Sequence, residues 1–208
     1  MKTVFQSRKT ILSRILFAAL ALLCLVPLLA GCGDSTGKKD LCWTLFSPYA
    51  ADIEFVFEKD GESVAGTAHV TRADTVRIDI TAPDPFTGIS AEMGADDRAD
   101  IISLSYSGIK AELPKNALDK LDLMLSLFAD SVAASAEKTP INAFVPCEEV
   151  YAVEGLAETK AYKAEFSHGN IRYLVVYDSL TGTPLDLCAE ADGSAVEVKI
   201  KKFKGAEF

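Results

Sequence analysis

The sequence predicts a mainly β fold of the α+β class, with one antiparallel sheet of about eleven strands and one long helix at roughly 117–136. Three observations support this. Apolar and polar residues alternate with a period of two over much of the chain after Ala51, turn motifs separate these runs, and one central stretch has helical spacing. Such alternation is typical of strands with one buried face, so we expect a curved sheet whose concave apolar face is covered by the helix.

The first half of the domain contains six predicted strands. Asp60-Gly61 is typical of a tight hairpin, and Ser107-Gly108 marks another turn. Pro83-Asp84-Pro85 interrupts the ladder because proline cannot donate a backbone hydrogen bond. The predicted strands cover residues 51–58, 64–71, 76–81, 89–93, 101–106 and 109–113.

The period changes after Pro114, which ends the first group of strands. Asn116 is a candidate N-cap, and an apolar stripe with helical spacing follows it. The stripe includes Leu121, Leu125 and Phe128 and predicts one continuous helix that ends near Ala136.

The alternation returns in the last third of the chain and predicts five more strands. Turns are expected at 168–170, 179–184 and 192–194, where Gly, Asn, Asp, Ser and Pro gather. The predicted strands cover residues 150–153, 161–166, 171–177, 185–189 and 196–203.

The N-terminal segment has the features of an export signal. Four basic residues precede an almost wholly apolar run, ILFAALALLCLVPLLA, at 15–30, which is shorter than the roughly 18–20 residues of a spanning helix. The run ends in Leu29-Ala30-Gly31-Cys32, which resembles the lipobox of bacterial lipoproteins. We therefore expect a signal peptide at 1–31 and acylation of Cys32 with chains such as palmitate; the alternatives are an ordinary secretory signal and a retained anchor helix.

The residues after Cys32 suggest how the domain is attached. Residues 33–40, GDSTGKKD, are small and polar, so we expect an acylated N-terminus and flexible tether over 32–50 and the folded domain over 51–208. Two or more acyl chains anchor a protein stably, so no spanning segment is needed. This places the protein outside the cytoplasm on the cell membrane, or on the outer membrane if the source has two.

The charge of the chain disfavours polyanionic partners. The first 31 residues hold four of the 21 Lys and Arg and none of the 30 Asp and Glu, so the mature part is strongly acidic. Nucleic acid and anionic lipid head groups would be repelled, which leaves the lipid on Cys32 as the membrane contact.

Three cysteines remain beyond Cys24 and Cys32. We expect a disulfide between Cys147 and Cys188, since both lie in the C-terminal half of an exported chain. Cys42 is a competing partner, and three buried thiols are the alternative. The chain has no CxxC pair that would indicate a redox site or a zinc knuckle.

The sequence offers no catalytic constellation. His69 and His168 are isolated from each other and from other ligands at metal spacing, and there is no GxSxG motif and no glycine-rich phosphate loop. We therefore predict a protein that is not an enzyme and that uses no cofactor or metal.

The apolar faces of the strands and the helix offer a candidate ligand site. They can form a filled core, or they can line a cleft in an open half-barrel that holds an apolar ligand. The candidate lining residues are Phe55, Phe57, Ile78, Ile80, Met93, Leu104, Tyr106, Leu121, Leu125 and Phe128.

Several strand-and-turn phrases resemble the lipoprotein-carrier superfamily, the LolA/LolB-like half-barrel, and in particular small clostridial lipoproteins. The phrases are HVTRADTVRIDITAP at 69–83, FTGI at 86–89, IISLSYSGIKAELP at 101–114 and YDSLTGTPL at 177–185. The resemblance covers roughly residues 50–204 and implies the half-barrel fold. It also implies that an acyl chain of a lipoprotein or another lipid binds in the concave face, while other members use the same shell as sensors of envelope stress.

We therefore expect a membrane-anchored extracytoplasmic lipoprotein that binds an acyl chain or another apolar ligand. The alternative is an envelope sensor or protein-interaction module with the same fold, a filled core and a protein partner.

Overall fold

The computed structural model describes residues 36–96, 100–117, 119–156 and 160–205. The predicted signal peptide, Cys32 and residues 33–35 lie outside this range. Within it, no helix combines the length and the hydropathy needed to cross a membrane.

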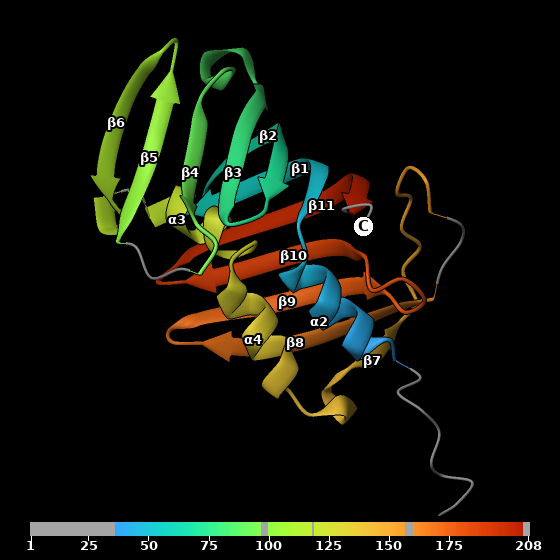
Figure 1. The fold of residues 1–208 in the computed structure, drawn as a ribbon. Helices are drawn as coiled ribbons and strands as arrows, with labels where there is room; N and C mark the ends of the chain where they lie inside the picture. The colour runs from blue at the N-terminus through green and yellow to red at the C-terminus, as the bar shows by residue number, and fades with distance from the viewer. Residues whose placement is uncertain (1–35, 97–99, 118, 157–159, 206–208) are drawn as a thin grey trace, which may run out of the picture. The chain divides into compact units, whose positions relative to one another are not determined.

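The strands of the described residues form one open antiparallel sheet (Figure 1). Its order is β6-β5-β4-β3-β2-β1-β11-β10-β9-β8-β7, so β6 and β7 are the two edges. β1 and β11, the first and last strands, pair with each other and join the two meanders. The eleven strands and the helices confirm the predicted fold class. The strands are β1 (Tyr49–Lys59), β2 (Glu62–Arg72), β3 (Thr75–Ala82), β4 (Ser90–Gly94), β5 (Ile101–Tyr106), β6 (Ile109–Pro114), β7 (Val145–Cys147), β8 (Ala161–His168), β9 (Ile171–Asp178), β10 (Pro184–Ala191) and β11 (Ser194–Gly205).

Three of the predicted hairpin turns have a backbone that matches their sequences. Both central residues have positive φ in Asp60-Gly61 (54° and 82°), Ser107-Gly108 (50° and 82°) and Asp192-Gly193 (48° and 75°). Positive φ at both positions is the mark of type I′ turns, whose twist fits that of the flanking strands.

The predicted single helix is in fact two, α3 (Asp119–Ser126) and α4 (Asp130–Lys138). The N–H groups of Leu127, Phe128 and Ala129 donate to carbonyls three residues earlier, at 3.1–3.3 Å, so the last turn of α3 tightens and stops. Two 3₁₀ turns at Asp84–Phe86 (η1) and Ile141–Ala143 (η3) lie in loops, and a third, Lys115–Ala117 (η2), precedes α3.

The break between α3 and α4 is held by partners from other elements. The N–H of Asp130 donates to the carbonyl of Ala95 at 2.8 Å, and Nε of Arg72 donates to the carbonyl of Phe128 at 3.1 Å. These groups replace the helical bonds that a continuous helix would have made, and the apolar spacing carries no sign of them.

The strand predicted at 150–153 does not form. Residues 148–156 instead form a loop beside the sheet: the N–H of Glu154 donates to the carbonyl of Lys201 at 2.8 Å, and Glu154 forms an isolated parallel bridge with Lys202 of β11. Val153 is buried, whereas Val150 is 89% exposed. Among the described residues this segment meets β11 in a single bridge and is not extended into a strand, while the short β7 over 145–147 was not predicted.

The expected tether contains a helix. Residues 38–46 form α2 (Lys38–Phe46), in which Leu41 and Leu45 are buried, and the folded unit begins at Thr36. Nζ of Lys38 donates to the carbonyls of Glu137 and Thr139 at 2.9 and 2.6 Å, so α2 is fixed to the end of α4. The start of the folded domain therefore moves from residue 51 to residue 36, because two buried leucines are enough to dock a short helix.

The core lies between the sheet and the helices. α3 contacts β3, β4, β10 and β11, and α4 contacts β8 and α2, as their neighbouring ribbons in Figure 1 also show. We call the face of the sheet that carries α3 and α4 the inner face and the opposite face the outer face. Phe55, Val198, Leu187 and Val175 are paired across adjacent strands and buried, so they form one row of the inner face.

Candidate functional site

The inner face is filled where the helices cover it. Of the ten side chains predicted to line a cleft, six are buried, with exposed fractions of 9% or less. These six form the core with the helices and are closed to a ligand at the surface. They are Phe55, Phe57, Ile78, Met93, Leu125 and Phe128.

The inner face is uncovered toward β6. Tyr106 of β5 and Ile109 of β6 are paired across the Ser107-Gly108 turn and are 53% and 73% exposed. By strand alternation both side chains share a face with Leu104 and with buried Ile102. Large apolar side chains that point to the inner face are therefore open to solvent at this end.

The loop between β3 and β4 adds to this surface. Phe86 of η1 is 43% exposed, and a Cβ at Gly88 would lie 3.9 Å from Cε2 of Tyr106, so the loop borders the Tyr106 ring. Ile80, which precedes the loop, is half-buried. We call this surface the open apolar strip; it comprises Ile80, Phe86, Leu104, Tyr106 and Ile109.

The structure therefore divides the predicted cleft residues into two groups. Ile80, Leu104 and Tyr106 belong to the open apolar strip, and Leu121 of α3 is half-buried beside the core. Phe86 and Ile109 were missed. Ile109 could have been found, since it continues the alternation of a predicted strand, but Phe86 lies in a proline-rich turn that carries no periodic signal.

Arg72 fixes the helices on the inner face. Its side chain is almost completely buried, and its guanidinium donates to the carbonyls of Phe46 and Ser47 at 2.6 and 2.9 Å. It also bonds the carbonyl of Phe128 and forms an ion pair with Asp130. One planar cation thus holds the end of α2 and the α3–α4 break. These contacts fix where the helices that cover the inner face lie.

On the outer face, Asp186 and Cys188 of β10 are half-buried, with Glu149 near Asp186. Burial raises the pKa of Asp186 to about 6, and the nearby charges of Glu197 and Glu149 add to the increase. Lys199 is paired with Asp186 in the register, but its Nζ bonds Glu197 at 2.9 Å. Burial likewise raises the pKa of the Cys188 thiol to about 11, which makes it a poor nucleophile near neutral pH.

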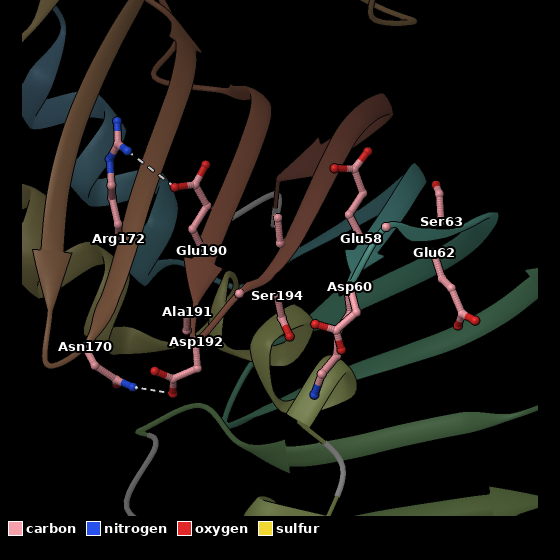
Figure 2. A pocket seen from close by; sticks show the side chains of 14 residues that line it. Glu58, Asp60, Glu62, Ser63, Asn170, Arg172, Glu190, Ala191, Asp192 and Ser194 are labelled. Atoms are coloured by element: carbon pink, nitrogen blue, oxygen red, sulfur yellow. Dashed lines mark hydrogen bonds and ion pairs between the residues drawn. The ribbon is translucent and has the colours of Figure 1, made fainter.

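A polar cleft of about 660 Å³ lies between the tips of the β1–β2 and β10–β11 hairpins (Figure 2). Carboxylates from both hairpins line it, and two are engaged by neighbours: Asn170 donates to Asp192 at 3.0 Å, and Arg172 donates to Glu190 at 3.4 Å. Its charged lining does not suit an acyl chain. The remaining acids that line it are Glu58, Asp60 and Glu62.

The predicted disulfide between Cys147 and Cys188 is absent, and both residues carry free thiols. They lie on β7 and β10, with β8 and β9 between them. Strands are about 4.8 Å apart, so three spacings exceed the roughly 7 Å limit between the Cα atoms of a disulfide.

The two histidines lie on different strands, β2 and β8. His69 lies on the outer face with its Nδ1 2.7 Å from Oδ1 of Asp52, and His168 ends β8 with its Nδ1 3.4 Å from Oγ of Ser135. In the part of the chain that the structure describes, no group of three or more His, Cys, Asp or Glu is placed to hold a metal ion.

Comparison with known proteins gives similarity in structure only. No protein-family model matches the chain, and no curated protein matches it. Among solved structures, the chain is similar to a LolA superfamily protein from Nitrosomonas europaea, with 11% identity, a TM-score of 0.42 and coverage of 84% of this chain and 93% of that chain. It is also similar to a conserved protein from Thermus thermophilus (13% identity, TM-score 0.44, coverage 82% and 85%). A third is LprF from Mycobacterium bovis (11% identity, TM-score 0.40, coverage 84% and 94%).

A LolA superfamily protein is thus among the solved structures that the chain resembles, as the strand-and-turn phrases predict. At these identities and TM-scores the similarities do not identify a function, which has to be inferred from the geometry of the inner face.

Proposed function

We propose that this protein is an extracytoplasmic lipoprotein, anchored to the membrane by acyl chains on Cys32, that binds an acyl chain or a similar apolar ligand on the open apolar strip. The function is binding without catalysis. The observation that carries the proposal is the exposure of Tyr106 and Ile109, two large side chains on the same face as the core.

Burial of this strip by a ligand is energetically reasonable. Each Å² of apolar surface removed from water contributes roughly 25 cal/mol, and one buried methylene contributes about 0.8 kcal/mol. A chain of several methylenes laid across Phe86, Tyr106 and Ile109 would therefore offset the entropy cost of binding. An acyl chain needs no charged partner, which fits a strip built from aromatic and aliphatic side chains.

The anchor would hold one side of the domain near the bilayer. Four residue spacings separate Cys32 from Thr36, where the folded unit begins, and they span at most about 14 Å. Trp43 and Leu180 are 69% and 75% exposed, and the hydroxyl of Thr44 lies 3.5 Å from the carbonyl of Thr181, so α2 and the β9–β10 turn are neighbours. An exposed tryptophan this close to the anchor suits a membrane–water interface.

The second candidate is an envelope sensor or protein-interaction module. The observation that favours it is the filled core, since six of the predicted cleft residues are packed under the helices. In that case a protein partner, and not a lipid, covers the open apolar strip.

The test is titration of residues 36–208 with a fluorescent twelve-carbon chain that carries a dansyl group and no charge. Circular dichroism and a cooperative thermal transition first establish that this unit is folded. Tyr106→Ser removes the ring at the centre of the strip, and we expect its Kd to rise by roughly tenfold, which corresponds to about 1.4 kcal/mol. Ile101→Ser is the matched control, because Ile101 is 49% exposed on the outer side of the same strand.

Two results would overturn the lipid proposal. One is the absence of saturable binding by the folded domain. The other is equal weakening by Tyr106→Ser and Ile101→Ser, since binding would then not depend on the inner face. Reproducible photo-crosslinking of a single protein at position 106 in membranes, together with no binding of the probe, would favour the sensor.

A further inference from the structure

The two edges of the sheet are protected differently. β7 has three residues with Pro146 at its centre, so it has little backbone to offer another strand. β6 runs from Ile109 to Pro114, and the register gives it β5 as its only neighbour among the described strands (Figure 1). Every β6 residue except Leu113 is exposed. β6 is therefore the edge that can accept a further strand.

The hairpin turn decides which β6 residues face that edge. Ser107 and Gly108 form a two-residue turn with positive φ between the paired residues Tyr106 and Ile109. In such a turn the carbonyl of the first residue accepts from the N–H of the fourth, here Ile109. In an antiparallel pair, residues alternate between bonding their neighbour and pointing away from it. Ile109, Ala111 and Leu113 therefore bond β5, whereas the N–H and C=O of Lys110 and Glu112 point to the free edge.

We propose that β6 pairs antiparallel with β6 of a second copy of this protein, about a two-fold axis at Ala111. In this register Lys110 of each copy lies opposite Glu112 of the other. Both residues have outward backbone groups, so each Lys110–Glu112 pair exchanges two backbone hydrogen bonds and places opposite charges side by side.

The side chains select this register over its neighbours. A shift that centres the axis on Lys110 opposes two lysines, and one that centres it on Glu112 opposes two glutamates, and like charges directly opposite are unfavourable. On the inner face, the chosen register sets Ile109, which is 73% exposed, opposite Leu113 of the second copy. Charges on an edge strand commonly prevent pairing, but this order of opposite charges blocks other registers and favours one.

Single cysteines in the full-length protein in its own membrane test the register. Ala111 and its counterpart would form a non-hydrogen-bonded pair with Cα atoms about 4.5 Å apart, within disulfide range. We expect Ala111→Cys to give a dimer on a non-reducing gel after treatment with copper–phenanthroline. Lys110→Cys and Glu112→Cys should not, since identical residues there lie beyond about 7 Å from each other.

The controls are the unmodified protein, whose own cysteines set the background, and Lys201→Cys, an exposed site on the outer side of the central strand β11. The proposal is wrong if Ala111→Cys gives no more dimer than Lys201→Cys. It is also wrong if Lys110→Cys or Glu112→Cys crosslinks as well as Ala111→Cys.

Charge reversal in the Ala111→Cys background tests the pairing itself. Lys110→Glu or Glu112→Lys alone should lower the crosslinked fraction severalfold, and the double exchange should restore it, because the opposite charges are then merely transposed. Lys201→Glu should have no effect. Failure of the double exchange to restore the dimer would contradict the charge pairing. Neither experiment uses the lipid ligand, so its outcome is independent of the proposed function.

Discussion

At the scale of single residues, Arg72 shows how one side chain fixes the position of two helices. Its guanidinium serves three backbone carbonyls and one carboxylate while almost completely buried. A buried charge is stable only when it is paired and hydrogen-bonded, so the site depends on the planar fork of arginine.

We expect Arg72→Ala to lower the free energy of unfolding by about 3–5 kcal/mol, because Asp130 and the helix-end carbonyls lose their partner. Arg72→Lys should recover only part of this, since an ammonium group cannot reach all the acceptors. Urea denaturation followed by circular dichroism measures both. Arg77→Lys, in the exposed pair with Asp79, is the control and should change stability by less than about 1 kcal/mol. An equally small effect of Arg72→Ala would contradict this role.

Asp186 should make stability depend on pH. Its pKa is about 6 in the folded protein and 3.8 as its ordinary value, so the folded state holds the proton more tightly. Stability is therefore highest below about pH 4 for this group and falls as the pH rises toward 6. Because Asp186 is partly exposed, we expect Asp186→Asn to raise the free energy of unfolding at pH 7 by only about 1 kcal/mol, and to leave it unchanged at pH 4. Thermal unfolding at both pH values measures this, and a gain of equal size at pH 4 would rule out titration as the cause.

At the scale of elements, local spacing predicts the strands and fails where a distant group intervenes. The apolar stripe from 118 to 132 suits one helix, yet Ala95 and Arg72 interrupt it at 127–129. Likewise, alternation over 150–153 suits a strand, but in the described residues the segment has one isolated bridge, between the next residue, Glu154, and Lys202 of β11. Both stretches have the periodicity of the predicted element. Contacts with residues distant in the sequence split the first into two helices, and no strand ladder forms along the second.

Within β2, Gly66 is needed for close packing on the inner face. A Cβ at this position would lie 2.5 Å from both Cζ of Phe55 and the carbonyl oxygen of Ala82, and the backbone oxygen cannot easily move. We expect Gly66→Ala to destabilise the protein by about 2–4 kcal/mol in urea denaturation. Gly205→Ala in β11 is the matched control, since its Cβ would meet only Phe203 at an ordinary 3.9 Å. Similar stability of the two variants would show that β2 can shift to make room.

At the scale of the whole molecule, the proposed arrangement is an acidic domain held by a lipid on a short connection. Residues 32–208 carry 17 basic against 30 acidic side chains, so they offer anionic lipid head groups no net attraction. In this arrangement, attachment depends on the lipid on Cys32. Two copies confined to the plane of a membrane would also meet more often than two copies that diffuse freely in solution.

We therefore expect Cys32→Ser to move the protein out of the mature membrane-bound pool and into an unprocessed or soluble form. Fractionation with an antibody to the domain measures this. Cys42→Ser is the control, because Cys42 lies within α2 and beyond the lipobox. A Cys32→Ser protein that still fractionates as mature membrane protein would disprove the anchor.

Local patterns in the sequence predict the fold class, most strands and most turns, because period-two alternation and Asp-Gly or Ser-Gly turns are local properties. It also supplied the predicted signal and lipobox, which lie outside the described residues. In the candidate site it assigns Leu104 and Tyr106 to the inner face, since alternation fixes which face a side chain takes.

Which part of that face is open depends on tertiary contacts. Alternation assigns both Phe55 and Tyr106 to the inner face, but Phe55 is buried in the core between the sheet and the helices, whereas Tyr106 is 53% exposed. The difference depends on where Arg72 and Ala95 end α3 and on the docking of α2, contacts between residues distant in the sequence. Spacing along the chain reports the face of a side chain, whereas its exposure depends on what packs against that face.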